Sequence, residues 1–179
     1  SEIEDAEREV RRLLRESSER VKTVIEEVRE LLRRVKREND EAVKEVEKSN
    51  RDLEDKVRRG NLSEEIKKKV EDIVRESEDL LRRSSERVRE LVEEIKRLLE
   101  ELKKRNDELV RRIEELVKKG GERVEELKER VKRLVADSER LLKELRDRVK
   151  ELADEARRTT EEVLRRNREL VRRIEEDIR

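Results

Sequence analysis

The side chains that could do chemistry in this chain are small polar ones, because the usual catalytic and metal-binding residue types are missing. The sequence has no His and no Cys, so it lacks the common general base, the thiolate nucleophile and the usual zinc ligands. Serine pairs such as Ser84-Ser85 have no base beside them to activate a hydroxyl. No acid lies in the interior of an apolar column. We therefore expect no enzyme, no cofactor and no metal site.

Basic pairs such as Arg11-Arg12 and Arg33-Arg34 raise the question of nucleic-acid binding. They lie among acids at helical spacing, as with Glu30 and Arg34, which is typical of solvated pairs along a helix. Lys plus Arg equals Asp plus Glu at 52 each, and there are no aromatic side chains for base stacking. We expect no nucleic-acid or membrane partner. Without a long apolar run, the chain is expected to be soluble, and cytoplasmic in an expression host.

The only glycines, Gly60, Gly120 and Gly121, divide the chain into three helices. Gly60 follows a basic last turn, where glycine accepts the left-handed conformation that ends many helices. Ser63 then offers an N-cap for the next helix. The helices are predicted over residues 2–59, 63–119 and 122–178. Connections this short make consecutive helices antiparallel, so we predict an all-α, up-down-up, three-helix bundle that forms a single domain over residues 1–179.

The apolar residues recur every 18 residues and not every seven. Ile73, Leu91 and Leu109 form one such column, whereas steps of seven from Ile73 through Leu80 reach Arg87. A seven-residue repeat gives left-handed supercoils and an eleven-residue repeat gives right-handed ones, and 18 residues make five turns between these limits. The helices are therefore predicted to be nearly straight. The broad apolar stripe suits a helix that packs against two neighbours.

The composition and the repeated phrases give the chain a resemblance to one class of protein. Cys, Phe, His, Met, Pro, Gln, Trp and Tyr are all absent, and 58% of the residues are charged. The phrase NDELVRRIEE, from Asn106, recurs from Asn167 as NRELVRRIEE. Over its whole length the chain resembles the parametrically designed helical bundles of de novo protein design. That resemblance implies a synthetic, rigid, rod-like scaffold without a natural biochemical activity.

Small polar residues interrupt the apolar columns, and their heights follow from the positions of the two loops. The loops are centred near residues 61 and 120.5, so facing residues sum to about 122 between the first two helices and about 241 between the last two. By this rule the polar residues fall into three layers, each supplied by all three helices. The layers are Ser17, Asn106 and Ser138; Asn39, Ser84, Thr159 and Thr160; and Ser49, Asn50, Ser77 and Asn167.

A buried hydroxyl or amide without a partner costs about 1–3 kcal/mol. Three helices that bring polar atoms to one height can satisfy one another. We hypothesise that the layers are hydrogen-bond networks that favour the intended register of the helices and penalise other registers. The alternative is that some of these residues face solvent.

The width of the apolar stripe bears on whether the chain associates. In a monomer two neighbouring helices cover each stripe, and outlying residues such as Ile25 and Leu164 widen it only locally. We expect a monomer that needs no partner. The alternative is an interaction module that self-associates or pairs with another helical chain. The missing residue types and regular columns argue against a natural spectrin-like segment, and the handedness of the bundle stays open.

Overall fold

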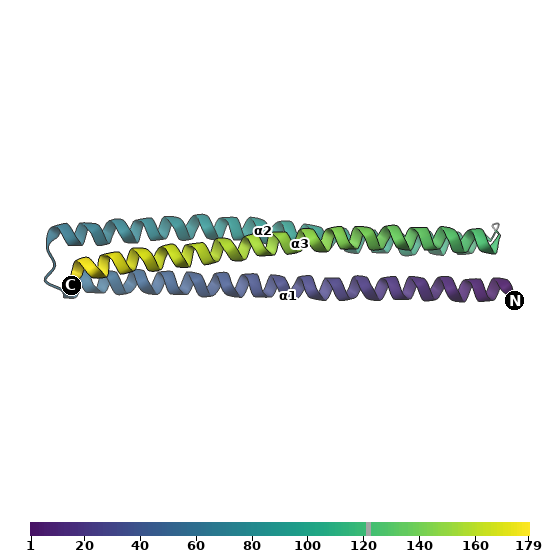
Figure 1. Ribbon diagram of the computed structural model, residues 1–179, viewed down its shortest axis with the longest axis horizontal. Coiled ribbons are helices and arrows are strands. Elements are labelled where there is room, and N and C mark those ends of the chain that lie inside the picture. The colour runs from purple at the N-terminus through teal and green to yellow at the C-terminus, as the bar shows by residue number, and fades with distance from the viewer. Residues whose placement is uncertain (121–122) are drawn as a thin grey trace. The chain divides into compact units, whose positions relative to one another are not determined.

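The computed structural model describes residues 1–120 and 123–179, and within these ranges the chain forms three α-helices and no strand. The helices are α1 (Glu2–Arg59), α2 (Glu64–Lys119) and α3 (Val124–Ile178) (Figure 1). The predicted boundaries agree with these to within two residues. Gly121 and the predicted helix start at residue 122 lie outside the described residues. The all-α three-helix bundle is confirmed.

The ends of the helices show which of the predicted capping residues begin or end a helix. The backbone N–H of Ile66 donates to Ser63 Oγ at 3.3 Å, so Ser63 is the N-cap of α2, as predicted. Gly120 is left-handed, with a φ of 52°. The left-handed conformation predicted for Gly60 is wrong, because Gly120 is the only described glycine with a positive φ. Gly60 is needed for space instead: a Cβ there would lie 2.7 Å from the carbonyl oxygen of Lys56.

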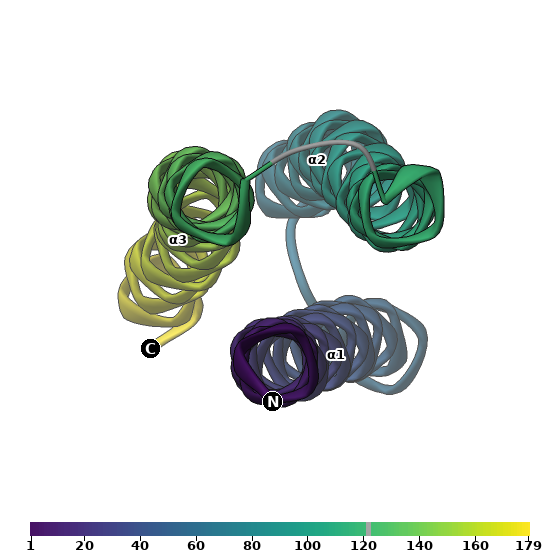
Figure 2. The same cartoon turned by 90° about the vertical axis from the view of Figure 1, so that its right-hand side faces the viewer.

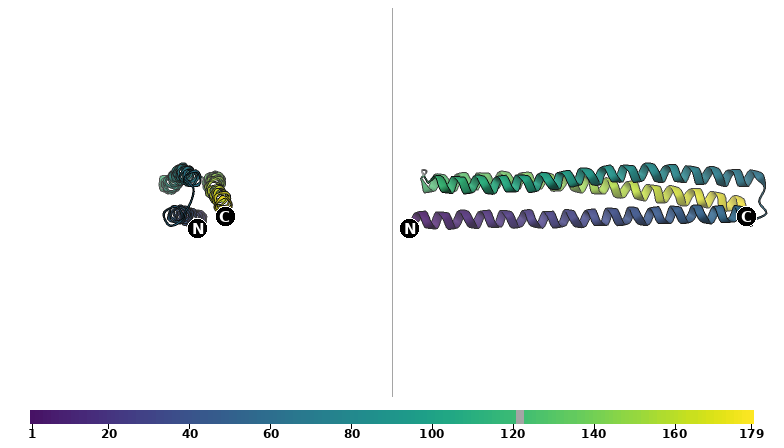
Figure 3. Two further views of the ribbon diagram at one scale, coloured as in Figure 1. Left: turned by 90° about the vertical axis from the view of Figure 1, so that its left-hand side faces the viewer. Right: turned by 180° about the vertical axis from the view of Figure 1, so that it is seen from behind.

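The helices pack within two compact units, and each helix contributes a segment to both. Unit 1 comprises Ser1–Leu31 and Glu94–Glu151, and unit 2 comprises Leu32–Glu93 and Leu152–Arg179. Figure 2 faces the end of unit 1 and shows its three helix segments around a common centre. The left panel of Figure 3 faces the end of unit 2 that carries the connection from α1 to α2. The single domain stays a prediction.

Aliphatic side chains from all three helices fill the centre of unit 1. The buried members of one cluster are Val10, Leu109, Ile113, Val131 and Val135. Burying each such side chain stabilises the fold by about 1.5–3 kcal/mol, which makes this apolar contact the main favourable term. The cluster shows that the columns spaced by 18 residues face inward, as the periodicity predicts.

Ion pairs in unit 1 show how α1 and α3 are aligned. Lys128 contacts Glu9 at 3.3 Å and Arg146 contacts Glu27 at 3.2 Å, and in both pairs the residue numbers differ by 119. The two predicted sums, 122 and 241, also differ by 119, so α1 and α3 run parallel in the predicted register. The long aliphatic stems of these side chains also cover the edges of the core.

Unit 2 follows the same register around its own core. Leu53, Val70, Val74 and Ile174 are buried together there. Between α1 and α3, Arg157 bonds to Glu38 at 3.0 Å, again with a difference of 119. Between α2 and α3, the partners Arg87 and Glu155 at 2.6 Å sum to 242, against the predicted 241. α2 is therefore antiparallel to α3 in unit 2, as predicted.

Candidate functional site: the buried polar layers

The three predicted layers are distributed over the two units. The first layer lies in unit 1, and the second and third lie in unit 2. None of the eleven residues is exposed. The buried ones are Ser17, Asn50, Ser77, Ser84, Thr160 and Asn167, and the half-buried ones are Asn39, Ser49, Asn106, Ser138 and Thr159. The alternative that some of them face solvent therefore stays open only for the five half-buried residues.

The third layer contains a hydrogen bond between two helices. Ser77 Oγ on α2 donates to Asn167 Oδ1 on α3 at 2.6 Å, and the two residues are 1% and 2% exposed. Both partners are side chains in the interior, where a hydrogen bond meets little competition from water. This bond joins two of the three helices that the sequence assigns to the layer.

The same layer holds two buried polar atoms that lack a partner. Asn167 Nδ2, a donor, and Asn50 Oδ1, an acceptor on α1, make no hydrogen bond. Asn50 is 6% exposed, so water reaches little of it. Ser49 beside it is half-buried. The layer thus has one bond between α2 and α3, and one unused donor and one unused acceptor that are chemically complementary.

The second layer behaves differently because its threonines bond within their own helix. Thr160 Oγ1 donates to the Ala156 carbonyl oxygen at 3.1 Å, and Thr159 Oγ1 donates to that of Glu155 at 2.8 Å. Threonine in a helix often bonds back to the carbonyl one turn earlier, and this satisfies the hydroxyl without a second helix. Within the described ranges, no hydrogen bond joins Asn39 or Ser84 to these threonines.

The first layer places Ser17, Asn106 and Ser138 in unit 1 without a hydrogen bond between them in the part of the chain that the structure describes. Asn106 Oδ1 is buried and has no partner. An unpaired carbonyl oxygen of this kind costs stability.

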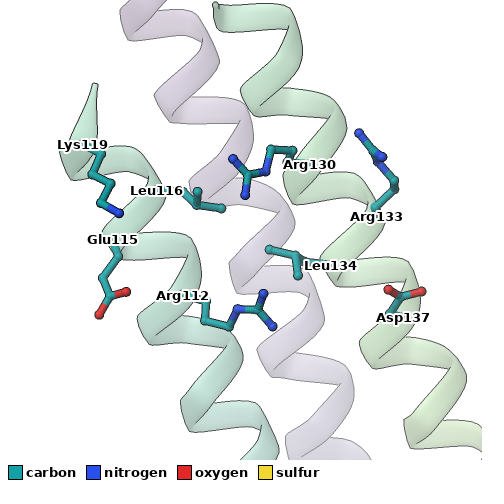
Figure 4. Close-up of a pocket in the computed structure, with 8 residues that line it drawn as sticks. All are labelled: Arg112, Glu115, Leu116, Lys119, Arg130, Arg133, Leu134 and Asp137. Carbon is teal, nitrogen blue, oxygen red and sulfur yellow. The ribbon is translucent and has the colours of Figure 1, made fainter. Parts of the chain in front are cut away.

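A surface hollow in unit 1 lies between α2 and α3, away from the layers. Figure 4 shows Leu116 and Leu134 pointing toward one another across it, with Arg112 and Arg130 reaching in from opposite helices. The hollow has more basic than acidic side chains, but these arginines are exposed. Exposed arginines are solvated, and the lining includes no buried polar residue, so the hollow is not built to hold an anion.

A second hollow, in unit 2, lies between α1 and α2 and reaches one of the layers. Val43, Asn50, Leu81 and Ser85 line it together with charged side chains from both helices. The sequence does not predict this hollow. The one related signal is the alternation of acid and base along each helix, which by itself predicts only solvated pairs within one helix.

Hydrogen bonds to carboxylates raise the pKa of three exposed arginines, Arg87, Arg148 and Arg168. The largest cause for Arg87 is its side-chain bond to Glu155. A base whose pKa is raised on folding adds stability that is fully present below its unfolded pKa, and loses it only as the pH rises through the folded pKa. Because arginine titrates in strongly alkaline solution, these pairs give no pH dependence near neutrality.

The described residues contain neither a cluster of metal ligands nor a helix that could span a membrane. Residues 1–120 and 123–179 contain no cluster of three or more His, Cys, Asp or Glu placed to bind a metal ion. None of the helices in these ranges combines the length and the apolar character that a membrane crossing requires.

Comparison of the chain with protein-family models, with curated proteins and with solved structures finds no match. The function must therefore be argued from the chain's own residues.

Proposed function

We propose that this protein is a designed structural scaffold, a helical bundle without catalytic activity whose register is specified by buried polar layers. The observation that carries the proposal is the buried hydrogen bond from Ser77 to Asn167, which joins α2 to α3 within one turn of the height that the loop rule gives. The unused donor of Asn167 and the unused acceptor of Asn50 support an extension of this network to α1. A slip of one turn would separate these groups and leave each of them buried and unpaired.

The kinds of polar group in the layers support a structural role over a catalytic one. The buried polar groups are amides and hydroxyls, which do not titrate near neutral pH. The hydroxyls of Thr159 and Thr160 are occupied by their own helix. Amides and hydroxyls of this kind can keep the helices in position through hydrogen bonds, and they do not transfer protons. The resemblance to parametrically designed bundles supports a synthetic origin.

A second candidate function is an interaction module that associates through a face of unit 2. The observation that favours it is the hollow between α1 and α2, whose lining includes the amide of Asn50. Both candidate functions use the same three-helix bundle and the same polar layers, and they differ only in whether the chain associates.

The register can be tested by crosslinking, because the chain has no cysteine and each introduced pair is the only one present. Arg20→Cys with Glu139→Cys places thiols on residues that form an ion pair between α1 and α3. Arg20→Cys with Lys143→Cys is about one turn out of register, since a turn is 3.6 residues. In the unaltered background we expect a short thiol crosslinker to join the first pair and not the second.

The variant Asn106→Leu then tests whether a polar layer specifies register. We expect it to raise the urea midpoint, because an unpaired buried amide is replaced by an apolar group, and to increase crosslinking of the out-of-register pair. Thr23→Leu, at an exposed position outside the layers, is the control. If Asn106→Leu leaves the out-of-register yield at the level of Thr23→Leu, the polar layer does not specify register and the proposal is wrong.

A further inference from the structure

Two hollows between α1 and α2 follow one another along unit 2, and we call them together the α1–α2 groove. Glu54 and Glu78 line both hollows, which makes the groove continuous. Val43, Val57 and Leu81 are among its lining residues and stay half-buried. The groove therefore has an apolar floor that the three helices of unit 2 do not fully cover.

The two other helix pairs of unit 2 are closed by ion pairs. Glu45 contacts Arg168 at 2.8 Å between α1 and α3, and Glu76 contacts Arg166 at 3.3 Å between α2 and α3. The charged residues that line the α1–α2 groove form no such pair across it in the part of the chain that the structure describes. The groove is thus the open side of this unit.

Asn50 lies in the lining of the groove, and its side chain makes no hydrogen bond to a residue that the structure describes. It is 6% exposed, and its Oδ1 is fully buried without a partner. Since burial of an unpaired amide is unfavourable, the side chain of Asn50 needs a hydrogen-bond partner. Its Oδ1 lies inside the bundle, so a molecule in the groove reaches only the small exposed part of this side chain.

Charges alternate along both lips of the groove. On α1 the lip residues are Glu47, Arg51, Glu54 and Arg58. On α2, taken in the opposite chain direction, they are Arg82, Glu78, Arg75 and Glu71. The hollow beside Asn50 is lined by Glu47 and Arg51 of α1 together with Glu78 and Arg82 of α2, so acids and bases of both lips surround the same hollow. Any occupant must offer the reverse sequence of charges on both of its flanks.

We propose that a second copy of this chain occupies the α1–α2 groove, related to the first by a two-fold axis that runs along the groove. The axis places the α1 lip of each copy against the α2 lip of the other, so Glu47 meets Arg82 and Arg51 meets Glu78 between copies. It also brings Asn50 of one copy to the height of Asn50 of the other.

The second copy is favoured over an unrelated helix because the groove is complementary to itself. A two-fold interface uses the same patch on both partners, so its charges and its polar groups must match themselves, as these do. A buried asparagine at one height of a helical interface is a known means to fix its register. The inference goes beyond the structural role, which stands whether or not the chain associates. It replaces the monomer that the width of the apolar stripe favours.

The test is the mass in solution of the full chain and of charge-reversed variants, measured by light scattering behind size-exclusion chromatography with refractive-index detection. The unaltered chain is expected to approach twice 21.8 kDa as its concentration rises. Variant X carries Glu47→Arg and Arg51→Glu, and variant Y carries Glu78→Arg and Arg82→Glu. Each keeps the net charge and sets like charges against each other between copies, so each alone is expected to be monomeric.

Mixing the two variants tests the geometry. In a mixed dimer the reversed lip of X meets the reversed lip of Y and the two unaltered lips meet each other, so an equimolar mixture of X and Y should regain the dimer. The matched control, Glu26→Arg with Arg29→Glu, reverses an exposed pair in unit 1 and should dimerise like the unaltered chain. Circular dichroism checks that all variants are helical.

Three outcomes would overturn the inference. The first is an unaltered chain that stays at 21.8 kDa up to its solubility limit. The second is dimerisation of X and of Y alone, which would place the interface elsewhere. The third is a mixture that stays monomeric while the unaltered chain dimerises, which would exclude this symmetry axis.

Discussion

At the scale of single residues, the polar layers show that hydroxyl groups of similar chemistry act differently. Ser77 reaches across to another helix, whereas Thr159 and Thr160 bond to carbonyls of their own helix. The branched threonine side chain is held in few rotamers in a helix, and one of them points its oxygen at the preceding turn. A serine in an apolar column is therefore the better candidate for a bond between helices.

Ser77→Ala should destabilise the protein, because it leaves both polar atoms of Asn167 buried without a partner. We expect the free energy of unfolding to fall by about 1–3 kcal/mol. The double variant Ser77→Ala with Asn167→Leu removes both partners and should recover most of that loss. Urea unfolding followed by circular dichroism gives the three values. A double variant less stable than Ser77→Ala would mean that Asn167 has another favourable contact.

The sequence assigned these residues to the inward side of their helices, where six are buried and five half-buried, but it did not predict their bonds. The periodicity of apolar residues determines which side of a helix a residue occupies, and the loop positions determine its height. Both the side and the height are therefore predictable from the sequence. Which atom bonds to which depends on rotamers and on the spacing of the helices. The side-chain oxygens of Asn50 and Asn106 therefore could not be assigned partners, and the structure leaves both unpaired.

At the scale of the helices, the boundaries were predictable because the signals at helix ends are local. Ser63 caps α2 through a contact three residues away, and Gly120 is left-handed at the end of α2. The conformation of Gly60 was not predictable from the same rule. Its requirement comes from the Lys56 carbonyl in the last turn of α1, which a Cβ on Gly60 would approach too closely. The predicted straightness of the helices stays a prediction.

Two alanine substitutions separate these two roles of glycine. Gly60→Ala places a Cβ against a backbone oxygen, which the chain can relieve only by moving the end of α1. Gly120→Ala makes only an ordinary contact, with the Lys118 carbonyl oxygen at 3.8 Å, but must hold a left-handed conformation, which costs about 1–2 kcal/mol. We expect both to lower the melting temperature, Gly60→Ala by more. Equal melting temperatures for Gly60→Ala and the unaltered chain would contradict the close approach at Gly60.

At the scale of the whole molecule, the charges balance in number and most of the ion pairs are exposed. The least exposed pairs between helices include Glu9 with Lys128 and Glu38 with Arg157, and even these are reached by solvent. Exposed pairs contribute about 0–1 kcal/mol each, so stability must come mainly from the aliphatic core. The sequence composition already indicates this difference between charged surface and aliphatic core, because 58% of the residues are charged and the aromatic residues are absent.

Salt should therefore weaken the fold only slightly. Raising NaCl to about 1 M shortens the Debye length to about 3 Å and screens the exposed pairs. We expect the free energy of unfolding to fall by about 1–3 kcal/mol. Urea must be the denaturant, because guanidinium chloride is itself a salt. A much larger loss would show that the ion pairs, and not the core, hold the helices together.

The constant offset of 119 residues between paired positions of α1 and α3 has a consequence for how fast each contact forms. Antiparallel neighbours have contacts of much shorter separation in the chain, as with Glu94 and Arg148, which are 54 residues apart. Contacts between α1 and α3 have no such short route, because every one of them must close the same long loop. We expect these contacts to form after the rate-limiting step, so that Glu38→Gln accelerates unfolding in stopped-flow measurements and leaves the folding rate nearly unchanged.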